Sequence, residues 1–116
     1  MSNFFQSEMV RGDLQEMAQL QEFCMRSMMT FPVLSTQKQL DYFNVLGDLI
    51  EKQKIFYTRL ALSEDEEARD MVLSMKDSVV LLGGDPSDDI MEMFDGLILK
   101  VDKLKEEAEK RLAQGG

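Results

Sequence analysis

Residues 90–112 read IMEMFDGLILKVDKLKEEAEKRL, and this stretch has the clearest helical pattern in the chain. Its apolar residues recur at alternating spacings of four and three, the repeat of one helix face; they are Ile90, Phe94, Leu97, Val101, Leu104 and Ala108. Opposite charges four residues apart, such as Lys103 and Glu107, support the last third of the helix in water. The stretch therefore predicts a long C-terminal helix with an apolar seam.

Two further helices are predicted in the N-terminal half. Residues 7–31 carry an apolar stripe at helical spacing, with Ser7 as a suitable N-cap and Pro32 as the stop. Residues 36–62 follow, and Thr36 begins a capping box there. Because apolar residues cover more than one stripe of this second helix, we expect it to lie at the centre of the fold.

A third helix is predicted between Ser63, which begins another capping box, and about residue 82. The pair Gly83-Gly84 ends this helix, since glycine adopts the left-handed conformation of a C-cap easily. Asp85 as N-cap and Pro86 in the first turn then start the fourth helix. The third and fourth helices are therefore expected to form an antiparallel hairpin.

These segments together predict an all-α fold, a four-helix antiparallel bundle. No alternating strand pattern persists anywhere. A chain of 116 residues and 13.3 kDa fits one domain, so we expect a single helical domain over residues 1–116 with frayed ends at 1–6 and 113–116.

Composition excludes several kinds of chemistry. The chain has no histidine, so His-based acid–base catalysis, His-containing nucleophile pairs and His-ligated zinc are absent. The lone Cys24 cannot form an internal disulfide and is interpreted as a small buried thiol. The N-terminus lacks a signal-peptide pattern and no apolar run is long enough to span a membrane, which predicts a cytoplasmic protein without a membrane partner.

The negative charge is concentrated in one segment. The net charge is −9, and residues 64–95 hold eleven acidic residues against two basic ones. Nucleic acids bind mainly through lysine and arginine, so direct nucleic-acid binding is not expected. We expect an acidic face suited to a basic protein partner; its candidate residues are Glu64, Glu66, Glu67, Asp70 and Asp77.

Four carboxylates also resemble the metal site of all-α nucleoside triphosphate pyrophosphohydrolases, which gather Glu-x-x-Glu and Glu-x-x-Asp motifs around Mg²⁺. The matching residues are Glu64, Glu67, Glu92 and Asp95. In the expected hairpin, Glu67 lies about ten residues, or roughly 15 Å, from the level of Glu92, too far for shared magnesium ligation. We therefore predict neither a metal, a cofactor nor a catalytic residue, and retain the hydrolase as an alternative.

Ten methionines suggest either core filling or an adaptable apolar binding surface. Met25 and Met29 lie off the main stripe of the first helix. Two phenylalanines near the N-terminus also need packing partners. Self-association along the seam or through this terminus is therefore expected; the candidate interface residues are Phe4, Phe5, Phe94, Leu97, Val101 and Leu104.

Three segments resemble one known family. They are Phe4–Val10 (FFQSEMV), Ile55–Asp65 (IFYTRLALSED), and the spaced residues Gly84, Pro86, Met91, Phe94 and Asp95. The chain resembles the domain of unknown function 1825 family, small helical proteins of cyanobacteria and their phages. The resemblance implies a helical fold and such a source, and for a phage copy a role in managing the infected host, but no activity.

The leading hypothesis from the sequence is a non-enzymatic protein that acts through protein–protein contacts, with itself, with a host protein or with both. Two alternatives remain: the Mg²⁺-dependent hydrolase, and an acidic decoy that occupies a basic site on a host nucleic-acid-binding protein.

Overall fold

The computed structural model describes residues 5–115 and contains, over that range, four α-helices and no strand. The elements are α1 (Glu8–Thr30), the 3-10 turn η1 (Phe31–Val33), α2 (Thr36–Leu62), α3 (Glu66–Leu81) and α4 (Ile90–Ala113). The predicted all-α class and the helical bundle are confirmed. With 27 residues α2 is longer than α4, which has 24.

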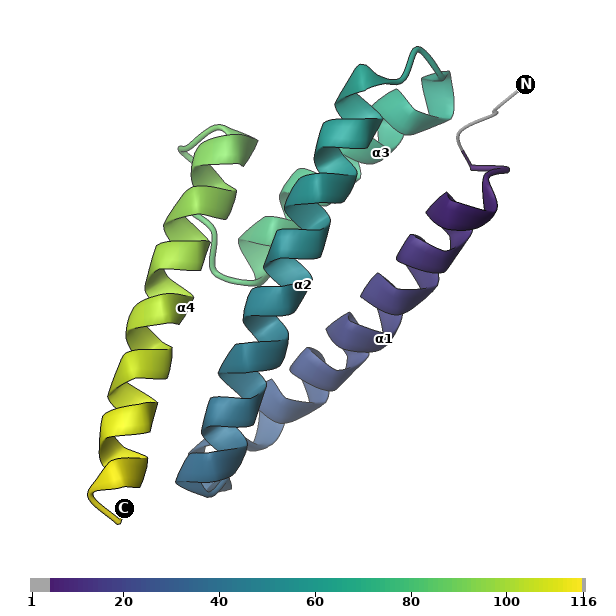
Figure 1. The fold of residues 1–116 in the computed structure, drawn as a ribbon. Coiled ribbons are helices and arrows are strands. Elements are labelled where there is room, and N and C mark those ends of the chain that lie inside the picture. The colour runs from purple at the N-terminus through teal and green to yellow at the C-terminus, as the bar shows by residue number, and fades with distance from the viewer. Residues whose placement is uncertain (1–4, 116) are drawn as a thin grey trace.

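The second helix is the centre of the molecule. Figure 1 shows α1, α2 and α4 side by side with α2 in the middle, and α3 packed across one end of α2. Two ion pairs show that the outer helices run antiparallel to α2: Arg59, near the end of α2, binds Asp13, near the start of α1, and Lys54 of α2 binds Asp95, near the start of α4. The central position predicted from the broad apolar cover of α2 is confirmed.

The core lies on both sides of α2. Leu49, Ile50 and Leu60 of α2 are completely buried, and each such side chain contributes about 1.5–3 kcal/mol through removal of apolar surface from water. Buried side chains of α1 and α3 meet the same helix, including Val10, Met17, Cys24, Ala68, Met75 and Val79. α1 scarcely touches α3 or α4, so nearly all of its packing is against α2.

Two helix starts in the first half are set by serines. The hydroxyl of Ser7 accepts a hydrogen bond from the backbone N–H of Val10, which confirms the predicted cap of α1. Ser35, not Thr36, caps α2 and accepts from the N–H of Lys38. The predicted cap is wrong by one residue because two adjacent hydroxyl side chains compete for it and the first has the extended backbone that a cap needs.

The starts of α3 and α4 also lie later than predicted. Asp65 caps α3, while the Ser63 hydroxyl accepts from the N–H of Asp65 in the turn before it. Asp89 caps α4, whereas Asp85 accepts from the N–H and hydroxyl of Ser87. These hydrogen bonds, the backbone one first, lower the pKa of Asp85. Asp85 therefore shapes a turn instead of starting the helix.

The expected hairpin of the third and fourth helices is wrong. α3 ends at Leu81, and Gly83 has the positive φ of 110° that favours glycine, as predicted. The chain then turns back before α4 begins, so α3 and α4 both run opposite to α2 (Figure 1). A Cβ on Gly83 would lie 3.6 Å from Leu97. A hairpin would instead place Gly83 at the start of α4, about 10 Å from the level of Leu97.

Candidate functional site

The acidic residues predicted to form one face lie at the start of α3 and along it. Glu64, Glu66, Glu67, Asp70 and Asp77 are all exposed, and within residues 5–115 none of their carboxylates is in an ion pair. Glu66 and Glu67 occupy the first turn of α3, where the helix dipole favours negative charge. Glu67 lies four residues before Met71, and Asp70 lies four residues before Ser74, so each acid is next to the later residue on the surface of α3.

The acids matched to a hydrolase do not converge. No group of three acidic or cysteine side chains in the described part of the chain is placed to hold a metal ion, and Glu64, Glu67, Glu92 and Asp95 are included in that finding. Asp95 instead accepts a hydrogen bond from Lys54 at 2.7 Å between Nζ and Oδ1. The structure thus assigns Asp95 to the contact between α2 and α4.

Three residues of the predicted interface are inside the molecule. Phe94, Leu97 and Val101 are 0%, 4% and 3% exposed. The seam of α4 packs against α2 in the same chain, so these residues offer no surface to a second copy; the interface prediction is wrong for them. Leu104 is 40% exposed. Phe5 packs against the core and Phe4 lies outside the described residues.

A groove lies between α1 and α3. It has a volume of about 270 Å³ and α2 forms its floor. The α1 wall consists of Leu14, Met17, Ala18 and Gln21, the α3 wall of Met71, Ser74, Met75 and Ser78, and the floor of Gln53 and Phe56. The groove forms because α1 and α3 both pack on α2 and scarcely on each other. Most of its lining is apolar, and three of its ten residues are methionine.

Apolar side chains extend the α1 wall toward the far end of the molecule. Met25 and Met28 follow Gln21 at four and seven residues, so they continue the same side of α1. They are 51% and 44% exposed. The sequence left the role of the methionines open between core and binding surface, and both occur: Met75 and Met93 are buried, whereas Met25 and Met28 are not.

Gln53 is the buried polar residue of the groove floor. Its side chain is 5% exposed, and Oε1 has no hydrogen-bond partner. Sequence reasoning missed this residue, although the spacing Leu46, Leu49, Gln53, Phe56 and Leu60 contains the signal: a polar side chain at a core position of the central helix. Buried acceptors in folded proteins nearly always have a hydrogen-bond donor, so the unsatisfied Oε1 makes the groove a candidate binding site.

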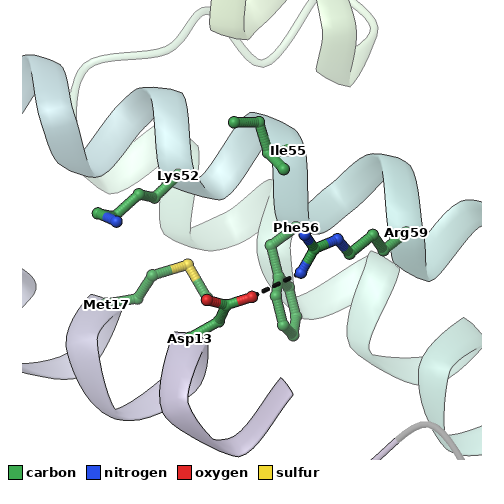
Figure 2. Close-up of a pocket in the computed structure, with 6 residues that line it drawn as sticks. All are labelled: Asp13, Met17, Lys52, Ile55, Phe56 and Arg59. Carbon is green, nitrogen blue, oxygen red and sulfur yellow. Dashed lines mark hydrogen bonds and ion pairs between the residues drawn. The ribbon is translucent and has the colours of Figure 1, made fainter. Parts of the chain in front are cut away.

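Figure 2 shows a second depression, of about 200 Å³, between α1 and α2. Asp13 and Arg59 face each other across it at 2.7 Å between Oδ2 and Nη1. Lys52 pairs with Glu16 of α1 at 3.1 Å. Both ion pairs are partly exposed, and they bridge the N-terminal half of α1 to α2. The charged groups of this depression are already paired with one another across α1 and α2, so we interpret it as a contact between the two helices and not as a binding site.

The cysteine is enclosed, as predicted. Cys24 has no exposed surface, and burial raises the pKa of its thiol to about 11. Burial, and then the charge on Cys24, also raise the pKa of Tyr42. A thiol with so high a pKa is a poor nucleophile at neutral pH.

Within residues 5–115, no helix is both long and apolar enough for a bilayer span.

Comparison with known proteins gives one match. A search of curated proteins and a search of solved structures each returned no significant match. A family model described as a domain of unknown function (DUF1825) matches residues 2–108, nearly the whole chain. The resemblance noted in the sequence is thereby confirmed, and the chain belongs to the DUF1825 family.

Proposed function

We propose that this chain is a non-catalytic protein-binding module, and that its contact surface is the groove between α1 and α3 together with the acidic side of α3. The supporting observation is the adjacency of the two features. Met71 and Ser74 line the groove, and the unpaired acids Glu67 and Asp70 lie on the same side of the same helix.

The size of the groove favours a protein partner over a small molecule. Pockets for drug-sized ligands have volumes of about 300–1,000 Å³ and enclose most of the ligand. This groove is smaller and opens along two helices. It suits a few side chains inserted from a surface that lies across it. Methionine walls adapt to such side chains because each methionine has three rotatable bonds.

Charge defines the kind of partner. The exposed acids repel polyphosphates and attract lysine and arginine. We place the interaction in the cytoplasm, because the chain has a single, buried cysteine and no internal disulfide that would point to an oxidising compartment. The partner is a basic protein of the cell in which this chain works. A second copy of this chain, with its own charge of −9, is a less suitable occupant.

The exposed acids also favour a more specific candidate, the acidic decoy. In that function the α3 acids occupy a basic surface that otherwise holds nucleic acid. The two candidates differ in a competition experiment: DNA added to the complex displaces this chain from a partner only if the contact lies on the nucleic-acid site of that partner.

The test uses the full chain and a synthetic helical peptide of about 18 residues, which is about 27 Å long. One peptide face carries leucine and alanine and the other carries lysine; a control peptide has the same composition in scrambled order. We expect the amphipathic peptide to bind more tightly than the control, and its affinity to fall between about 50 and about 300 mM salt. Equal binding of both peptides contradicts the proposal.

Two single variants locate the contact. Glu67→Gln removes a charge four residues before Met71, on the groove side of α3. Glu66→Gln removes the same charge from the neighbouring residue, which lies on a different side of the helix from Met71 and Met75. The first variant is expected to weaken binding more than the second, and equal effects would place the peptide elsewhere. Sedimentation equilibrium of the free chain measures self-association, and a dimer mass at micromolar concentration would favour a second copy as the natural occupant.

A further inference from the structure

The inference concerns Gln53, at the floor of the groove. Gln53 lines the groove together with Phe56 and is 95% buried, and its Oε1 lacks a hydrogen-bond donor. A buried acceptor without a donor opposes folding, whereas an apolar side chain of the same shape would not. The position therefore gives the folded chain a disadvantage unless a bound molecule supplies the missing donor.

The surroundings of Gln53 allow a donor to enter. The side chains that line the groove beside it include Met17, Met71 and Met75, and methionine side chains can move aside by rotation. The walls also contain three small residues, Ala18, Ser74 and Ser78. Small side chains let the backbone of another helix approach closely, so the groove is shaped for a helix that lies along it and inserts a side chain at its middle.

The length of the walls matches a short helix. The groove lining runs from Leu14 to Gln21 on α1 and from Met71 to Ser78 on α3, a separation of seven residues, or about 10 Å at 1.5 Å per residue, on each wall. A helix that lies along this length presents residues at three positions, i, i+3 or i+4, and i+7, to the groove. The central one of these lies opposite the middle of the groove and can reach its floor.

On the basis of the proposed function, we infer that the partner is a basic amphipathic helix with one uncharged hydrogen-bond donor in the middle of its apolar face. Oε1 of Gln53 accepts the hydrogen bond from this donor. An asparagine, glutamine, serine or threonine supplies the donor without the cost of burying a charge among apolar side chains. Lysine and arginine lie on the flank of the helix, opposite Glu67 and Asp70. Gln53 is thus the residue that determines partner specificity, and the acids supply attraction to any basic helix.

The test is a selection from a displayed library of helical peptides, with apolar residues fixed at the outer groove positions and the central and flanking positions randomised. The bait is the full chain, as wild type, as Gln53→Leu, and as Glu67→Gln with Asp70→Asn. Wild type is expected to enrich uncharged donors at the central position and lysine or arginine on one flank. Gln53→Leu is expected to lose the central preference and keep the basic flank, and the acid variant is expected to do the reverse.

Affinities of the selected peptides give the quantitative test. Replacing the central donor by leucine is expected to weaken binding to wild type about fivefold or more and to leave binding to Gln53→Leu unchanged or improved. Basic peptides without a central preference would overturn the role of Gln53 and leave the proposed function intact. No enrichment above a scrambled library would overturn both. The circular dichroism spectrum of Gln53→Leu shows whether this variant remains folded.

Discussion

Replacing Gln53 by leucine is expected to stabilise the folded chain. The substitution removes a buried acceptor that lacks a donor and adds an apolar side chain of similar size to the floor of the groove. Removal of the unsatisfied acceptor is expected to raise the free energy of unfolding by about 1–3 kcal/mol. For a domain of this size such a gain raises Tm by roughly 4–12 °C. Thermal and urea unfolding followed by circular dichroism measure both quantities.

The matched control is Gln19→Leu, which makes the same chemical change at an exposed position of α1. This control is expected to alter the free energy of unfolding by no more than about 0.5 kcal/mol. The reasoning is refuted if Gln53→Leu lowers the free energy of unfolding by about 1 kcal/mol or more. Such a loss would mean that Oε1 accepts a hydrogen bond in solution, and the groove would then contain no unfilled acceptor.

Three further predictions concern the stability of the fold. Phe94→Ala is expected to lower the free energy of unfolding by about 3–5 kcal/mol because it opens a cavity between α4 and α2, whereas Leu104→Ala costs less because its side chain is 40% exposed; urea unfolding distinguishes them. Replacing Arg59 by methionine removes the ion pair with Asp13 and is expected to cost about 0.2–1 kcal/mol, less at high salt; no change in salt dependence would show that the pair is not formed in solution. The pKa of the Cys24 thiol is about 11 in the folded chain and 9.0 ordinarily, so the unfolded chain releases this proton first and the free energy of unfolding falls as pH rises from about 9 to 11. When the free energy of unfolding is plotted against pH, wild type and Cys24→Ala are expected to have the same slope below pH 9 and different slopes above it.

Helical periodicity predicted the fold well because the apolar stripes are long. The seam from Ile90 to Ala108 and the broad apolar cover of α2 depend on spacing alone, and spacing is visible in the sequence. The helix starts were less predictable, since several oxygen-bearing side chains stand within a few residues of each true cap. Ser35 competes with Thr36, and Asp89 with Asp85, and the choice depends on backbone angles that local sequence does not fix.

The candidate site was harder to predict than the fold. Periodicity shows that Phe94 and Leu97 share an apolar face, but it does not show whether another helix of the same chain or a second copy covers that face. Gln53 could have been found as a polar residue at a core spacing of α2. The groove above it could not, because it arises from the absence of packing between α1 and α3, which are distant in sequence.

The arrangement of α1 has a consequence for motion within the native state. Nearly all its packing is against one helix, and its N-terminal half is bridged by partly exposed ion pairs. Amide hydrogens of α1 are therefore expected to exchange through a local opening that leaves α2 and α4 intact, while those of α2 exchange only with complete unfolding. The same opening admits thiol reagents to Cys24, so the rate of its labelling measures how often this helix separates from the rest.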